Sequence, residues 1–253
     1  MVRLPGQPGP TPGTTDAARI GGARARLSGD NSLAEPPRTG QDRRRDLSAV
    51  AVGATPPCWQ RITILSYTIR DYTPADEPLW LRCRVLSFLS TAYFDDVDRA
   101  KPAIEPPGLE LIAVDDRDAV VGIMDTIIEG QLATIDTVAV HPDHQHRGLG
   151  RSLLEQTRER ARAAGAVTLD AWTRDDPDTL AWYRAMGFTE SDHYLHVYAN
   201  CRAAPDEPGR AIIEPRPGLR PVMAFLHAEL ADEEQLRGEF ARVHVCRRFA
   251  MPI

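Results

Sequence analysis

Residues 134–154, TIDTVAVHPDHQHRGLGRSLL, decide the fold of this chain. The pattern predicts a valine-rich β-strand, a His-Pro turn, a loop that contains glycine, and an amphipathic helix. Gly148 and Gly150 lie where the helix begins, and because they lack a Cβ atom a ligand can approach the main chain closely. The N–H groups at a helix N-terminus carry partial positive charge, so the segment predicts a binding site for phosphate or pyrophosphate.

Two other kinds of phosphate loop fit this segment less well. No Gly-Lys-Ser or Gly-Lys-Thr follows it, as a Walker loop requires. A dinucleotide-binding fingerprint needs a third glycine, which the segment lacks. An ordinary strand-turn-helix unit without a ligand is the remaining structural alternative.

Local signals along residues 61–200 predict a mixed α/β domain. The predicted strands are residues 62–72, 109–114, 119–128, 132–140, 167–173 and 188–199. The first predicted helix follows Thr73, and the second spans residues 91–100. The third runs from Gly148 to Gly165, and the fourth runs from Asp176 to Gly187. The order is therefore β-α-α-β-β-β-α-β-α-β, and the helical crossover makes strands 132–140 and 167–173 parallel.

The two ends of the chain carry weaker signals. Residues 1–60 are rich in Pro, Gly, Ser, Thr and Arg without any helical or strand period, so we expect a disordered leader. Residues 201–253 form a C-terminal extension with a predicted strand at 219–227 and a predicted helix at 232–241. Residues 243–253 pair with the sheet or trail off, and the extension either completes the sheet or flanks one edge of it.

Composition bears on the class of function. The formal net charge of -6 argues against nonspecific attraction to nucleic acid or to an anionic membrane, and it weakly favours a cationic substrate.

The four cysteines are scattered and form no CxxC pair, so reduced thiols are expected. These cysteines are Cys58, Cys83, Cys201 and Cys246. No apolar run reaches transmembrane length, and the run after Arg43-Arg44-Arg45 is too short for a twin-arginine signal. We therefore expect a cytoplasmic protein.

Two motifs resemble those of the GNAT superfamily of N-acetyltransferases. Residues 145–150, QHRGLG, fit the acyl-CoA-binding pattern Gln/Arg-x-x-Gly-x-Gly/Ala. Residues 183–188, YRAMGF, are similar to the Tyr-x-x-x-Gly-Phe motif that ends the fourth helix of the family. The resemblance covers residues 64–199 and implies the mixed α/β sheet of the GNAT acyl-CoA N-acyltransferase fold. It also implies transfer of an acetyl group from acetyl-CoA to a primary amine, by direct attack in a ternary complex and without a metal.

The resemblance also assigns residues to the coenzyme. The main chain of Val138, Ala139 and Val140 is expected to hydrogen-bond the pantetheine arm, and one of these groups is expected to face the oxyanion. The pyrophosphate is expected to lie on the following loop and first helical turn, formed by Gln145, His146, Arg147, Gly148, Leu149, Gly150, Arg151 and Ser152. Asp176 stands where the family often has a pantetheine-binding Asn, and it is also the predicted N-cap of its helix.

Tyr183 corresponds to the tyrosine that serves the family as general acid beside the coenzyme sulfur. A thiol with a pKa of about 8.5 leaves as thiolate, and a tyrosine with a pKa of about 10 is protonated at neutral pH, so it holds a proton that it can donate. A core aromatic on an amphipathic helix is the structural alternative.

The general base has several candidates. In the histone-modifying branch of the family a glutamate acts as the base, and its position here falls near Thr134, which cannot accept a proton. Asp136 lies two residues further on and on the same face of the strand, so it is the first candidate. Asp125, Glu129 and an ordered water chain are alternatives, and an edge carboxylate without a catalytic role is another explanation for Asp136.

Two clusters have plainer explanations than a ligand site. Three histidines lie close together in the sequence, namely His141, His144 and His146. A phosphate-binding turn explains this cluster without a metal site. Three tryptophans are expected in the core or at the rim of a site, namely Trp80, Trp172 and Trp182.

The acceptor is the least specified part of the interpretation. A small molecule, an antibiotic, a protein N-terminus and a lysine are all compatible amines. The acidic residues 95–98 would attract a cationic amine, or they form a solvated surface. A homodimer is one expected assembly, because dimers are frequent in proteins that resemble this one. One alternative is a non-catalytic acyl-CoA-binding domain with a regulatory or partner-binding role. The other is a role linked to nucleic acid, such as modification of a ribosomal protein or tRNA, and the acidic balance counts against direct RNA binding.

Overall fold

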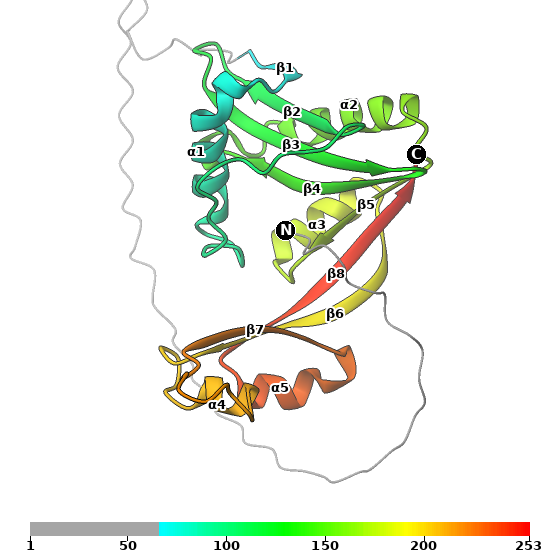
Figure 1. The fold of residues 1–253 in the computed structure, drawn as a ribbon. Coiled ribbons are helices and arrows are strands. Elements are labelled where there is room, and N and C mark those ends of the chain that lie inside the picture. The colour runs from blue at the N-terminus through cyan, green and yellow to red at the C-terminus, as the bar shows by residue number, and fades with distance from the viewer. Residues whose placement is uncertain (1–65) are drawn as a thin grey trace, which may run out of the picture. The chain divides into compact units, whose positions relative to one another are not determined.

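A mixed sheet of eight strands, in the order β1-β2-β3-β4-β5-β8-β6-β7, is the framework of the chain (Figure 1). The computed structural model describes residues 66–253, so the predicted leader lies outside the described residues. The strands are β1 (Thr68–Asp71), β2 (Leu109–Val114), β3 (Val120–Glu129), β4 (Leu132–Val140), β5 (Thr168–Thr173), β6 (Thr189–Asn200), β7 (Met223–Ala228) and β8 (Arg242–Pro252). The helices are α1 (Glu77–Phe88), α2 (Leu149–Ala163), α3 (Pro177–Ala185), α4 (Glu207–Ala211) and α5 (Glu233–Glu239).

Most of the predicted elements between residues 68 and 200 are confirmed. The Thr73 N–H and hydroxyl donate to the Asp76 carboxylate at the start of the helical segment, as its capping sequence predicts. Strands β4 and β5 are parallel, as the crossover through α2 requires. Gly165 and Gly187 end their helices with φ of 94° and 91°, a conformation that glycine adopts at little cost.

The helix predicted for residues 91–100 is wrong, because this segment consists of turns and bends. Its acidic side chains and carbonyls are bound by arginines from elsewhere in the fold. Arg84, which is 2% exposed, pairs with Asp96 and Asp98, while Arg242 pairs with Asp95. These tertiary ion pairs and a hydrogen bond from Arg84 to the Asp96 carbonyl replace the helical hydrogen bonds.

The C-terminal extension both completes the sheet and lengthens it. Strand β8 lies between β5 and β6 and is antiparallel to both. Strand β7 pairs with β6 and forms the edge of the sheet. Residues 201–241 are therefore an insertion between two neighbouring strands, and Figure 1 shows its helices α4 and α5 beside β7. The last residues of the chain belong to the middle of the sheet.

Helices cover the two faces of the sheet unevenly. Side chains alternate along β3, so Met124 lies in the core beneath α2 and α3, while Ile123 lies in a second core beneath α1. A third core, around Val197 and Val245, joins β6 and β8 to α4 and α5. Along β8 the alternation places this third core on the same face as α3, because Val245 and Phe249 are four residues apart. None of the helices formed by residues 66–253 has the length and apolar character needed to cross a membrane.

The only lysine of the chain, Lys101, is buried between two carboxylates on the α1 face. Its side chain is 3% exposed, its ammonium lies 3.0 Å from Asp125, and it also pairs with Glu110. The rings of Tyr72 and Trp80 lie 4.8 and 5.2 Å from the same ammonium. Burial raises the pKa of Asp125 to about 7, against the opposing effect of Lys101.

Lys101→Met should lower the free energy of unfolding by about 3–5 kcal/mol, because the buried Asp125 loses the cation that compensates it. Urea denaturation followed by circular dichroism measures this change. The double variant Lys101→Met/Asp125→Asn should recover part of the loss, since the most buried carboxylate is then neutral. A Lys101→Met protein as stable as the wild-type chain would contradict this account of the cluster.

Candidate active site

A β-bulge in β4 places Asp136. The register with β3 passes from Thr126 opposite Ile135 to Asp125 opposite Thr137, which leaves Asp136 as the extra residue. A bulge redirects the side chains that follow it. Accordingly, Ile135 lies in the core beneath α2, whereas Ala139 lies in the core beneath α1. The bulge turns the Asp136 side chain toward a cavity between β4 and β5.

Strands β4 and β5 separate beyond the bulge. Their parallel pairing ends at Ile135 opposite Ala171, although β4 continues to Val140. The His141 N–H donates to the Val121 carbonyl on β3, so His141 faces β3. By alternation, the main-chain groups of Val138 and Val140 point the other way, into the gap. This is where the resemblance places the pantetheine arm.

The N-terminus of α2 opens into the same cavity. Gly148 precedes the helix with φ of 82°, in the left-handed region, and no side chain caps the helix. The first intrahelical bond is donated by the Ser152 N–H to the Gly148 carbonyl at 3.0 Å. The amides of residues 149–151 therefore have no intrahelical acceptor and are oriented to bind an anion.

The cavity has a volume of about 540 Å³ and brings most of the predicted site residues together. Those that line it are Asp136, Val138, Ala139, Val140, Gln145, His146, Gly148, Leu149, Gly150, Arg151 and Tyr183. Three predicted residues lie beside it. Arg147 donates to the Tyr67 hydroxyl and to the Asp143 carbonyl, and Ser152 is exposed on the helix. Asp176 caps α3 by accepting the Thr179 N–H, and Asp178 and Thr179 line the cavity instead.

Tyr183 packs in the core and also lines the cavity. It is 3% exposed, its ring stacks on Phe249 with centroids 5.3 Å apart, and Phe188 and Trp182 contact it edge-on. Its hydroxyl makes no hydrogen bond to any residue from 66 to 253. Burial raises the pKa of Tyr183 further above its ordinary value, so the hydroxyl keeps its proton at neutral pH.

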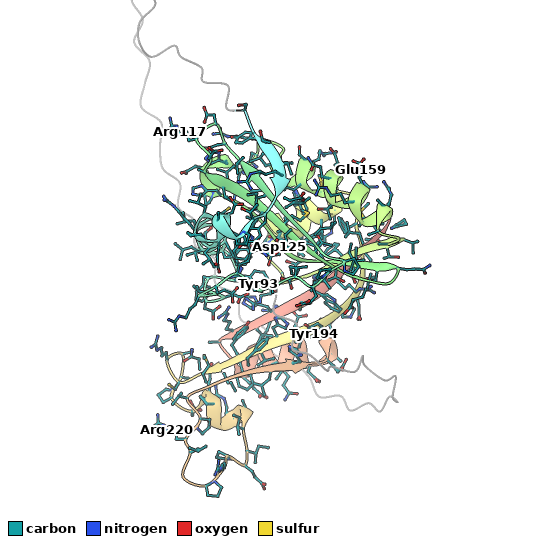
Figure 2. All side chains as sticks on the ribbon, turned by 45° about the horizontal axis from the view of Figure 1, so that its top comes forward. Tyr93, Arg117, Asp125, Glu159, Tyr194 and Arg220 are labelled. Carbon is teal, nitrogen blue, oxygen red and sulfur yellow. The ribbon has the colours of Figure 1, made fainter. Side chains whose placement is uncertain are left out.

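Among the three carboxylates considered as a base, Asp136 alone lines the cavity. It accepts a hydrogen bond from the Thr137 hydroxyl at 3.2 Å. Asp125 is 2% exposed and lies against Lys101, and Figure 2 shows it on the half of the sheet that α1 covers. Glu129 lies at the far end of β3 and is exposed.

Several cavity residues carry no recognisable sequence motif. A Cβ atom on Gly150 would lie 3.2 Å from the Trp182 indole nitrogen, so the second glycine of the loop makes room for a tryptophan of α3. Three further aromatic residues line the cavity, namely Phe88, Tyr93 and Trp172. Trp80 lies in the core, as predicted. Their roles depend on contacts between distant segments, which local sequence patterns do not report.

Two of the histidines and the acidic run are bound by other groups of the protein rather than by a ligand. The His144 ring shares a hydrogen bond with the Tyr67 hydroxyl at 3.2 Å, and the His141 ring accepts the Asp143 N–H. Within residues 66–253, no three His, Cys, Asp or Glu side chains gather as metal ligands. Asp95 is held by Arg242, so its charge serves to anchor the loop.

Comparison with known proteins identifies the domain. The family model described as the acetyltransferase (GNAT) domain matches residues 107–190, which contain the bulge, the gap and the α2 N-terminus. Residues 107–190 of this chain are therefore a GNAT acetyltransferase domain.

Individual relatives of this chain match over 67 to 96 residues. The [ribosomal protein bS18]-alanine N-acetyltransferase of Salmonella typhimurium is 33% identical over 96 residues, covering 38% of this chain and 64% of that protein. The enzyme of the same description from Escherichia coli strain K12 is 38% identical over 67 residues, covering 26% and 45%. The chain thus spans less than two thirds of these curated relatives. The crystal structure of the ribosomal-protein-S18-alanine N-acetyltransferase from Escherichia coli is 18% identical, with a TM-score of 0.47 over 74% of this chain and 94% of that one.

Gly150→Leu should weaken acetyl-CoA binding by about tenfold or more, because the added side chain pushes the Trp182 indole into the cavity. Isothermal titration calorimetry on the full chain measures the affinity. Gly238→Leu is the matched control, since a Cβ atom there meets nothing within 4 Å. Equal affinity in the Gly150→Leu and Gly238→Leu proteins would contradict the assignment of the cavity to the coenzyme.

Proposed function

We propose that this chain is an N-acetyltransferase that transfers the acetyl group of acetyl-CoA to a primary amine by direct attack in a ternary complex. The observation that carries the proposal is the gap between β4 and β5. It joins a carboxylate on a bulge, a protonated tyrosine and an uncapped helix N-terminus in one cavity. A cytoplasmic location remains the expectation from composition.

The chemistry of the cavity fits acetyl-CoA. The amides of residues 149–151 and the Arg151 side chain would hold the pyrophosphate at the positive end of α2. The main chain of Val138 and Val140 would bind the amide groups of the pantetheine arm as an added strand does. When bound, acetyl-CoA supplies an activated acyl group with a thiolate as leaving group.

Two residues of the cavity, Asp136 and Tyr183, would each carry out one proton transfer. Asp136 would accept a proton from the acceptor amine as its nitrogen forms a bond to the acetyl carbon. An N–H group of Val138 or Val140 would stabilise the negative charge that develops on the carbonyl oxygen. Tyr183 would donate its hydroxyl proton to the sulfur as the C–S bond breaks, and solvent would then restore the tyrosine. Asp136 would release its proton to solvent in turn, so protons and electrons balance without a further reactant.

A protein amine is the acceptor named for two of the matching relatives. The matching enzymes of Salmonella and Escherichia are described as alanine N-acetyltransferases of ribosomal protein bS18. We therefore propose a polypeptide amine as the acceptor class, with small amines as the competing class in any screen.

Tyr183→Phe should lower kcat by about 100-fold while acetyl-CoA affinity changes little, because only the proton donor is removed from an otherwise unchanged stack. Thiol release in the presence of a panel of peptides and amines measures turnover, and calorimetry measures binding. Tyr72→Phe, which changes a tyrosine outside the cavity, is the control. Unchanged kcat in the Tyr183→Phe protein would exclude Tyr183 as the general acid.

Asp136→Asn should lower kcat by about 100-fold or more at neutral pH, because an amide cannot accept the amine proton. Asp125→Asn is the matched control, since it removes a carboxylate from the neighbouring strand that does not line the cavity. If both variants turn over as the wild-type chain does, the base is a different group. Binding of acetyl-CoA without turnover by the wild-type chain on any amine would favour the non-catalytic alternative.

A further inference from the structure

One face of the sheet formed by β5, β8, β6 and β7 carries aromatic side chains and no helix from the described part of the chain. Leu195 and Val197 face α4 and α5, so by alternation the intervening residues of β6 face the opposite side. Trp172 is likewise opposite to Ala171, which lies in the core beneath α2 and α3. We call this surface the aromatic platform; it consists of Trp172, Tyr194, His196, Tyr198, Phe225 and His227.

The aromatic platform is continuous with the candidate active site. Trp172 lines the cavity, and its ring centroid lies 5.1 Å from that of Tyr194. Tyr194 contacts His227 at 4.7 Å, and Phe225 contacts both His196 and Tyr198, at 4.9 and 4.7 Å. Figure 2 shows Tyr194 between the half of the sheet that holds Asp125 and the insertion that holds Arg220. The rings therefore lead from the cavity wall to the edge strand that the insertion adds.

The outer part of the aromatic platform is apolar and exposed. Phe225 is 50% exposed, and its neighbours Met223 and Val222 are 63% and 55% exposed. Exposed apolar surface of this kind marks an interaction site more often than a solvated one. The edge of β7 beyond it pairs with no strand of residues 66–253.

The two histidines of the aromatic platform are uncharged near pH 7, and the nearby Arg174 guanidinium donates to the Tyr198 hydroxyl. Burial, with Arg174 nearby, lowers the pKa of His196 to about 3, and burial lowers the pKa of His227. Arg242 is paired with Asp95, and Arg248 with Asp170. Uncharged side chains, aromatic or aliphatic, are the chemistry that suits such a surface.

The acceptor has to reach the cavity from the side on which the aromatic platform lies. Helices α2 and α3 pack on one face of the sheet, and the phosphate site at the start of α2 belongs to that face. The cavity is lined by Tyr183 from α3 and by Phe88 from α1, so it passes through the gap in the sheet. With the coenzyme entering from the α2 face, the α1 face remains for the amine.

The length of the aromatic platform distinguishes a polypeptide from a small amine. Three strand spacings separate β5 from β7, which amounts to about 14 Å. An extended peptide covers that distance with about four or five residues. A small amine would reach Trp172 and leave the exposed residues of β7 uncovered.

We infer that the aromatic platform binds the acceptor as an extended polypeptide, with apolar or aromatic side chains within about five residues of the amine to be acetylated. This inference rests on the proposed function, because it assigns the amine end of the peptide to Asp136. The insertion at residues 201–241 would then select the substrate, while β4, β5 and α2 carry out the transfer.

The test is peptide binding, measured without turnover. Fluorescence anisotropy on the full chain compares a labelled pentapeptide that carries two aromatic residues with the same peptide carrying serine in their place. Met223→Ser/Phe225→Ser should weaken binding of the aromatic peptide by about tenfold and leave acetyl-CoA affinity unchanged. Ile213→Ser, which changes a residue that is 88% exposed and outside the aromatic platform, should bind as the wild-type chain does.

Two results would overturn the inference. The first is equal affinity of the wild-type chain for both peptides, or of the double variant and the wild-type chain for the aromatic peptide. The second is a dimer, seen by analytical ultracentrifugation, that the double variant converts to monomers, because a second copy would then cover the aromatic platform. Failure of the proposed function would be seen separately, as the absence of acetyl-CoA binding and thiol release, on which the anisotropy does not depend.

Discussion

The separation of β4 from β5 is the constraint on which the rest of the structure depends. Parallel pairing stops at Ile135 and Ala171, and one extra residue in β4 turns the strand away. The same event exposes main-chain hydrogen-bonding groups, aims the Asp136 carboxylate into the opening and directs the chain toward the left-handed Gly148 that starts α2. A sheet that paired along its full length would have neither a cavity nor a candidate catalytic carboxylate there.

The second wall of the cavity is held by the end of the chain. Strand β8 pairs with every residue of β5, and Phe249 of β8 stacks on Tyr183. Because the stack leaves the tyrosine hydroxyl at the cavity, the last strand fixes the position of the candidate proton donor. The C-terminal residues therefore belong to the site, and the insertion that precedes them adds Phe225 and His227 to the aromatic platform.

Local sequence signals predict the elements that local physics determines. The capping of α3 by Asp176, the glycines that end α2 and α3, and the strand-loop-helix unit around Gly148 depend on neighbours a few residues away. The failures depend on distant partners. Arg84 and Arg242 hold residues 91–100 as a loop, and the place of β8 in the sheet is set by pairing with strands far back along the chain. The contact of Gly150 with Trp182 is equally beyond a local pattern.

Hydrogen–deuterium exchange followed by NMR tests the central claim that the coenzyme lies in the gap between β4 and β5. With saturating acetyl-CoA, the amides of Val138, Val140 and residues 149–151 should exchange more slowly, because they acquire acceptors on the pantetheine and the pyrophosphate. The His141 amide, which already donates to the Val121 carbonyl, should change little. Binding of acetyl-CoA with protection confined to another part of the sheet would contradict the account.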